Sequence, residues 1–259
     1  MPLLELQKEG LKNATMTMTT DPRMTGPRVG LILPSLNTTT EPDFIRQAPS
    51  DVGFFATRVF MQVSTPDDLR AMNAQLDNAC KLIASTTPDV VVYACTSGTF
   101  LDGNSALAEM TSKIEALTSC PVVTTSAALL DALAALSVSR LAIAAPYPED
   151  VTAAESSFFE SNGYEVVSSR ALLRSGNEIR KISAAEIERL VIDADSSDAD
   201  AIVVSCTDLR AFELVTHLEK VVGKPVLTSN QATLWAVLKQ LKRPCTSNSA
   251  GSLFELTQG

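Results

Sequence analysis

Three short apolar motifs occur twice in the sequence, in the same order, and the two copies of each lie more than 100 residues apart. The first and second motifs repeat at offsets of 112 and 111 residues, and the third repeats after a shorter connection. The pairs are Arg28–Pro34 with Arg140–Pro146, Val90–Thr96 with Ala201–Thr207, and Cys120–Ser126 with Lys224–Asn230. An internal repeat of this kind predicts two similar structural units. We therefore expect two halves, at residues 28–137 and 138–242.

Short apolar runs alternate with amphipathic segments through both halves. The runs are apolar throughout, which is typical of parallel strands covered on both faces, and their alternation with helices predicts an α/β fold. The expected strands are Val29–Leu33, Asp89–Ala94, Pro121–Thr124, Arg140–Ala144, Ala201–Ser205 and Pro225–Leu227, and the expected helices include Thr65–Ala84, Glu149–Ser161, Ala184–Ala194 and Leu209–Val222. We expect two Rossmann-like or flavodoxin-like halves with parallel sheets, related by a pseudo-twofold axis, with the active site in the cleft between them.

The two ends of the chain lack this pattern. Residues 1–27 are interpreted as a flexible N-terminal extension, with Met16 or Met18 as alternative starts, and residues 243–259 as a C-terminal tail. No apolar run approaches the ~18 to 20 residues that span a bilayer, so we expect no membrane association. The segment before Arg28 also lacks the apolar core of a secretory signal.

Charge and cysteine content narrow the function further. With 21 Lys and Arg against 30 Asp and Glu, the net charge is −9, which argues against nucleic-acid binding. Five widely spaced cysteines, an odd number, suggest a reducing cytoplasm. The only histidine is His217, so histidine-based triads and multi-histidine metal sites have little material. We expect His217 on an exposed helix face and Arg210 in a helical salt bridge.

Cys95 and Cys206 occupy equivalent places in the repeat, and each follows a predicted strand and precedes a threonine. Ligands of open α/β sheets bind outside the carboxyl ends of the strands. If the halves face each other, these two thiols meet across one cleft. The other three cysteines are interpreted as buried packing residues; they are Cys80, Cys120 and Cys245.

Several motifs at predicted strand ends resemble those of the Asp/Glu racemase superfamily. The resemblance runs from about Arg28 to Leu241 and is greatest to maleate cis–trans isomerases and ectoine-utilisation proteins, with arylmalonate decarboxylases more distant. The motifs that carry it are Pro-Ser-Leu-Asn-Thr-Thr at 34–39, Cys-Thr-Ser-Gly at 95–98, Pro-Tyr at 146–147, Gly-Asn at 176–177, Ser-Cys-Thr at 205–207 and Ser-Asn-Gln-Ala-Thr-Leu-Trp at 229–235.

This resemblance implies a cofactor-independent, metal-free enzyme that acts on a small dicarboxylate, and a homo-oligomer, either dimer or tetramer. In such isomerases the cysteine matching Cys95 adds as a thiolate to the alkene, and the one matching Cys206 supplies and reclaims a proton. A thiolate is both a strong nucleophile toward an electron-poor alkene and a good leaving group. Because a free thiol has a pKa of about 8.5, we expect the site to lower it.

The same resemblance implies a set of substrate-binding residues. Asn37 follows the first strand, and its amide is expected to donate to a substrate carboxylate. We expect Thr96 or Ser97 to cap a helix after Cys95, and the turn after Cys206 to begin a helix in the same way. The full substrate-binding set is Asn37, Thr96, Ser97, Tyr147, Asn177 and Thr207.

Three other functions stay open on the sequence alone. One is an ectoine-pathway reaction, because those proteins carry much the same motifs. Another is racemisation of an amino acid such as aspartate or glutamate by two thiols, although nothing provides an obvious anchor for the ammonium group. The third is dicarboxylate binding without turnover, against which the two intact cysteines argue. The leading hypothesis is isomerisation of maleate to fumarate through a covalent thioether.

Overall fold

The computed structural model describes residues 21–244 and 250–256. It contains two four-stranded parallel sheets, in the orders β2-β1-β3-β4 and β6-β5-β7-β8. The first sheet comprises β1 (Arg28–Pro34), β2 (Gly53–Val59), β3 (Val90–Tyr93) and β4 (Val122–Thr124), and the second comprises β5 (Arg140–Ala145), β6 (Glu165–Ala171), β7 (Ala201–Val204) and β8 (Val226–Thr228). The identical strand orders confirm the predicted α/β fold with two similar parallel sheets.

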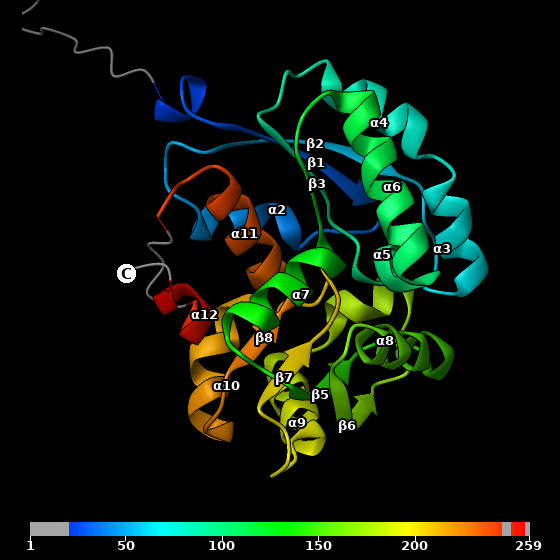
Figure 1. The fold of residues 1–259 in the computed structure, drawn as a ribbon, viewed down its shortest axis with the longest axis vertical. Helices are drawn as coiled ribbons and strands as arrows, with labels where there is room; N and C mark the ends of the chain where they lie inside the picture. Colours follow the sequence, from blue (N-terminus) through cyan, green and yellow to red (C-terminus); the bar gives the residue numbers. More distant parts are fainter. Residues whose placement is uncertain (1–20, 245–249, 257–259) are drawn as a thin grey trace, which may run out of the picture.

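Helices cover both sheets (Figure 1). Those of the first half are the 3₁₀ helix η1 (Pro22–Met24), α2 (Thr40–Gln47), α3 (Pro66–Asn73), α4 (Leu76–Ala84), α5 (Thr96–Phe100), α6 (Gly103–Thr118) and α7 (Thr125–Ala135). Those that follow are α8 (Glu149–Ser161), the 3₁₀ helices η2 (Gly176–Lys181) and η3 (Phe212–Leu214), α9 (Ala184–Ala194), α10 (Val215–Val222), α11 (Ser229–Gln240) and α12 (Gly251–Glu255).

The structure departs from the expected elements in four places. Strands β2 and β6 were not predicted, because each has exposed or partly exposed polar positions instead of the continuous apolar run that marks the other edge strands, β4 and β8. The helix expected over Thr65–Ala84 is divided into α3 and α4. The helix expected from Leu209 begins only at Val215, after η3.

The chain after the second half, which we expected to be a C-terminal tail, includes a short buried helix. Helix α12 buries Leu253 and Phe254, and the Phe254 ring packs edge-on against Phe212 at 6.0 Å. The Gln231 side chain of α11 also donates a hydrogen bond to the Ala250 carbonyl at 2.5 Å. In the N-terminal segment, Asp21 caps η1, and residues 1–20 lie outside the described part of the chain.

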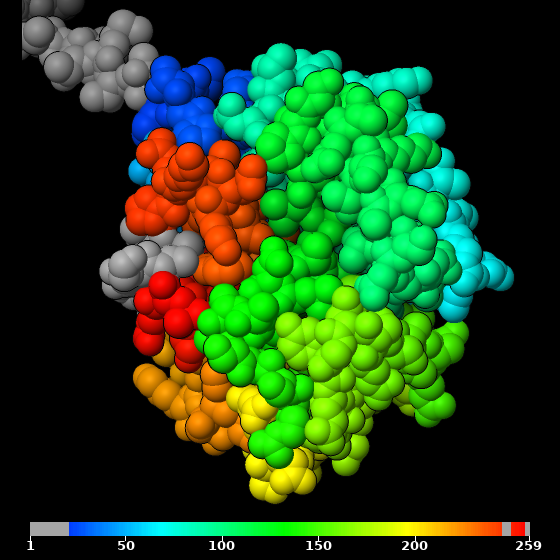
Figure 2. All heavy atoms as spheres, viewed as in Figure 1, coloured from blue at the N-terminus to red at the C-terminus, as the bar shows by residue number. Residues whose placement is uncertain are grey.

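Helices α7 and α11 follow the equivalent strands β4 and β8 and pack against each other at the junction of the two halves. Their atoms lie side by side on the face seen in Figure 2. Thr233 of α11 donates to Thr125 of α7 at 3.3 Å, so the junction is partly polar as well as apolar. This contact brings the carboxyl ends of β3 and β7, and the residues that follow them, to one place.

Candidate active site

A cavity of about 20 Å³ lies where residues that follow β1, β3, β5 and β7 meet. This volume holds roughly one water molecule. Among the residues around it are Leu36, Asn37, Cys95, Thr96, Ser97, Tyr147, Ile179, Cys206, Thr207 and Asp208. Both halves therefore contribute to one cavity, as the sequence predicts.

Cys95 follows β3 and is buried, with only 4% of its surface exposed. Its sulfur caps α5 by accepting a hydrogen bond from the Gly98 backbone N–H at 3.3 Å, and Ser97 Oγ lies 3.9 Å away. The expected cap, Thr96 or Ser97, is thus replaced by the cysteine itself. Burial raises the pKa of Cys95 to about 11, against the smaller lowering effect of these two groups. Burial in the cavity therefore favours the thiol form of Cys95, contrary to the lowered pKa that we expected.

Cys206 follows β7 and has a positive φ of 91°, which is rare for a residue with a side chain. Its N–H donates to Ser229 Oγ at 3.0 Å, and its sulfur accepts from the Asp208 N–H at 3.4 Å. No helix begins at this turn, in contrast to our expectation, because the chain continues in irregular turns to η3. Burial raises the pKa of Cys206, and the nearby Asp208 carboxylate raises it further.

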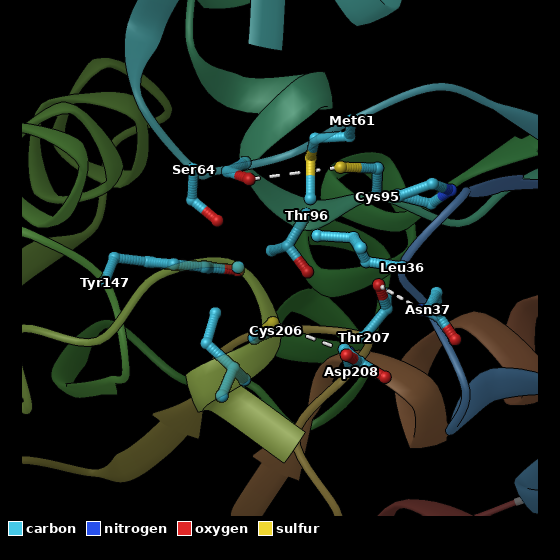
Figure 3. A pocket seen from close by; sticks show the side chains of 14 residues that line it. Leu36, Asn37, Met61, Ser64, Cys95, Thr96, Tyr147, Cys206, Thr207 and Asp208 are labelled. Carbon is cyan, nitrogen blue, oxygen red and sulfur yellow. Dashed lines mark hydrogen bonds between the residues drawn. The ribbon is translucent and has the colours of Figure 1, made fainter. Parts of the chain in front are cut away.

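Tyr147 extends from the end of β5 toward the space between the two cysteines (Figure 3). Only 1% of its surface is exposed. Burial raises its pKa well above the usual value, and negative charge on Cys206, Glu155 or Cys95 acts in the same direction. The Tyr147 phenol therefore remains protonated and is a hydrogen-bond donor within the cavity.

Asn37 and Thr207 connect the two halves at the cavity wall (Figure 3). Asn37 Nδ2 donates to Thr207 Oγ1 at 3.1 Å and to Thr40 Oγ1 at 3.0 Å. Its Oδ1 accepts from the backbone N–H groups of Thr39 and Thr40. Thr207 Oγ1 donates in turn to the Ala94 carbonyl at 3.2 Å. Both amide hydrogens of Asn37 are thus engaged, and a bound carboxylate would have to replace one of these acceptors.

Thr96 and Asn177, both expected to bind substrate, differ from each other in placement: Thr96 lies at the cavity and Asn177 does not. Thr96 lines the cavity, and its hydroxyl donates across the junction to Ser229 Oγ at 2.8 Å. Asn177 is exposed and is not among the cavity-lining residues, although Gly176 and Ile179 of the same 3₁₀ helix are. The physical reason is the tight η2 turn, which directs Ile179 inward and Asn177 toward solvent.

Comparison with known proteins now identifies the family. The sequence matches the family model described as arylmalonate decarboxylase over residues 29–254, nearly the whole described chain. The chain belongs to the arylmalonate decarboxylase family. This membership confirms the resemblance to the Asp/Glu racemase superfamily that the motifs indicate, and it identifies the chain as an enzyme.

Relatives of the family include maleate isomerases. Maleate isomerase from Nocardia farcinica is 31% identical over 241 residues, which cover 87% of this chain and 94% of the relative. A mutant of the Nocardia farcinica maleate cis–trans isomerase, solved with a covalently bound succinylcysteine intermediate, matches with a TM-score of 0.85 and 28% identity, covering 90% of this chain and 99% of that chain. Arylmalonate decarboxylase from Bordetella bronchiseptica is 27% identical over 216 residues, which cover 82% of this chain and 90% of that relative.

Three buried acidic residues of this family member were not singled out from the sequence. Asp208 accepts hydrogen bonds from the Thr38 N–H at 2.7 Å and from Thr39 Oγ1 at 3.1 Å, which ties the β1–α2 loop to the second half. Asp43 and Glu155 occupy equivalent positions of the repeat, on α2 and α8, and both are buried. A Glu or Asp in an amphipathic helix is usually solvated, so their burial has no sequence signal except the repeat offset itself.

His217 and Arg210, which we did not expect to take part in the site, are not among the residues that line the cavity. His217 is exposed on α10 and lies 3.1 Å from Glu188, as expected for a surface residue. Arg210 is exposed in the irregular segment before η3, so the expected position in a helix was wrong. Within residues 21–244 and 250–256, no helix is both long and apolar enough to cross a membrane.

Two segments from different halves form a roof over the cavity. Met61 and Ser64 come from the segment after β2, and Gly176 and Ile179 come from η2. The Ser64 N–H donates to Ser175 Oγ at 2.6 Å, which joins the segments. A side chain on Gly176 would place its Cβ 2.5 Å from the Gln62 carbonyl oxygen, so only glycine fits this close approach.

Replacing Gly176 by alanine is therefore expected to open the roof. We expect Gly176→Ala to destabilise the protein by about 1–3 kcal/mol, because the added Cβ meets backbone and φ is +54°. Gly163→Ala is the matched control, since Gly163 has a φ of +86° but no atom within 4 Å of the added Cβ. Thermal unfolding of both variants measures the difference. Equal destabilisation would contradict a specific contact between the roof segments.

Proposed function

We propose that this protein converts maleate, or a closely related cis-unsaturated dicarboxylate, into its trans isomer without a cofactor. One observation carries the proposal: two thiols, Cys95 and Cys206, come from equivalent positions of the two halves and line the same buried cavity. The similarity to maleate isomerases over most of the chain supports this substrate class.

The proposed reaction uses one thiolate and one thiol, and Cys95 must first lose to solvent the proton that its raised pKa retains in the protein without substrate. The Cys95 thiolate adds to one alkene carbon, and the displaced π electrons move toward the carboxylate on the other carbon. Cys206 gives its proton to that carbon, which leaves a single bond between the two carbons. After rotation about this bond, the Cys206 thiolate takes the proton back, the double bond forms again, and Cys95 leaves as a thiolate.

The surroundings of the two thiols favour this division of roles. The Cys95 sulfur has the Gly98 N–H and the Ser97 hydroxyl as neighbours, and both stabilise a negative charge. The Cys206 sulfur has the Asp208 carboxylate nearby, which opposes a negative charge and retains the proton. Cys95 is accordingly the more readily ionised thiol and Cys206 the proton donor.

We infer that the two substrate carboxylates bind to donors around the thiols. Asn37 and Thr207 would serve one side, and Thr96, Ser97 and Tyr147 the other, each through a charge-assisted hydrogen bond. Asn177, which is exposed on the η2 segment of the roof, would contact a carboxylate only after that segment moves. The cavity has room for roughly one water molecule, which is too little for a four-carbon diacid. Binding would therefore require movement of the roof or of the β1–α2 loop.

The deciding experiment follows the vinyl protons of maleate by NMR after incubation with the purified protein in deuterated buffer. Appearance of fumarate, absent with Cys95→Ser and retained with Cys120→Ser, is the expected result. Cys120 is a suitable control because it is a free thiol that does not line the cavity. No fumarate would overturn the proposal. Deuterium incorporated at Cα of aspartate or glutamate would indicate racemisation instead.

We also infer a homo-oligomer in a reducing compartment. The oligomer follows from the family resemblance, and light scattering of the purified protein tests it. The compartment is inferred from the odd number and the wide spacing of the five cysteines.

A further inference from the structure

Glu155 is a buried carboxyl group directly behind the cavity. It lies on α8, and its surface is 0% exposed. One oxygen, Oε1, accepts a hydrogen bond from Ser205 Oγ, whereas Oε2 has no hydrogen-bond partner among the described residues. A buried polar atom without a partner destabilises the folded state, so a purely structural role would be served better by an apolar side chain.

The partner of Glu155 immediately precedes the strained residue of the cavity. Ser205 is followed by Cys206, whose φ of 91° persists only where the surroundings fix the backbone. The Ser205 N–H donates to the Ala144 carbonyl at 3.0 Å, and the Cys206 N–H donates to Ser229 Oγ at 3.0 Å. The Ser205 side chain, held by Glu155, completes this set of restraints.

The first half has no equivalent of this arrangement. Ala94 stands where the second half has Ser205, and its methyl group accepts and donates no hydrogen bond. Cys95 has an ordinary φ of −147°. The carboxyl group equivalent to Glu155 is that of Asp43, which instead accepts from Asn230 Nδ2 at 2.8 Å. Of these two equivalent positions, the buried carboxyl–serine pair thus occurs at the one where the cysteine is strained.

We propose that Glu155 is a positioning residue for Cys206: by holding the Ser205 hydroxyl, it fixes the backbone that directs the Cys206 thiol into the cavity. This inference rests on the proposed proton transfer by Cys206. It assigns to α8 a part in the reaction although no α8 residue lines the cavity.

A neutral carboxyl group suits this role. Burial raises the pKa of Glu155 to about 8, against a lowering effect of the Ser205 hydroxyl, so the group is mostly protonated near neutrality. An ionised Glu155 would disfavour negative charge on Tyr147, which lies close enough to respond to it. Glutamine reproduces both the hydrogen-bond acceptor and the neutrality, and it is therefore the conservative replacement.

The test compares five variants with maleate as substrate. Glu155→Gln is expected to retain kcat, whereas Glu155→Met, of similar length but without an acceptor, is expected to lower kcat about tenfold to a hundredfold with little change in KM. Ser205→Ala is expected to match the methionine variant, and the double variant Ser205→Ala, Glu155→Met to be no worse than either. Glu160→Gln, on the exposed face of the same helix, is the control with unchanged kcat.

A second readout does not depend on turnover. Iodoacetamide labelling, followed by peptide mass spectrometry, gives the ratio of Cys206 to Cys95 modification in each variant. We expect this ratio to change with Glu155→Met and Ser205→Ala but not with Glu155→Gln. If wild-type protein failed to convert maleate, a changed ratio would still support positioning. An unchanged ratio, full kcat in Ser205→Ala, or equal losses in the Gln and Met variants would overturn the inference.

Discussion

Cys95→Ser is expected to reduce kcat for maleate by about a thousandfold or more, because a serine hydroxyl at this position is neither ionised nor a good leaving group. Two steps of the proposed reaction depend on the sulfur: it adds to the alkene in the first step and leaves in the last. The change should leave the fold intact, since serine is close in size to cysteine and its oxygen accepts the Gly98 N–H that the sulfur now accepts.

The measurement is steady-state conversion of maleate, with circular dichroism to verify folding. Cys120→Ser provides the matched control, because it makes the same replacement at a thiol outside the cavity. Substantial turnover by folded Cys95→Ser would show that the nucleophile had been assigned to the wrong residue.

Cys206→Ser is expected to have a different effect, namely accumulation of a covalent adduct on Cys95. The carbanion formed by sulfur addition is a strong base and accepts a proton from any donor, including Tyr147 or water. Removal of that carbon-bound proton needs a positioned base, and serine is a far weaker one than a thiolate. We therefore expect turnover to fall about a hundredfold or more while the adduct persists.

Intact-protein mass spectrometry detects this adduct as a gain equal to one molecule of maleic acid. The mass gain should be absent in the variant that carries both Cys95→Ser and Cys206→Ser. An adduct that formed in the double variant, or on a peptide without Cys95, would place the nucleophile elsewhere.

The central strands and the two cysteines could be predicted for one physical reason. Strands β1, β3, β5 and β7 are buried between neighbouring strands and helices, so their sequences are continuously apolar and the repeat is visible in them. Strands β2 and β6 carry polar residues at their exposed positions, which removes the signal, whereas the other two edge strands, β4 and β8, keep a short apolar run.

The rest of the site depends on tertiary packing that a local pattern does not contain. The orientation of Asn177 is set by the η2 turn, and the raised pKa of Cys95 is set by burial in a closed cavity. Glu155 has the spacing of an ordinary helix residue, yet packing between α8 and the second sheet removes it from solvent. Such residues become recognisable only when the fold places them beside the cavity.

The small volume of the ligand-free cavity also has a kinetic meaning. Because the cavity has room for little more than one water, we expect productive encounters with a dicarboxylate only in the fraction of time that the cavity is wider. The association rate constant is then expected to follow the frequency of opening and to lie below that of diffusion to an exposed cleft. Slow capture of the substrate would then accompany a reaction that takes place away from bulk solvent.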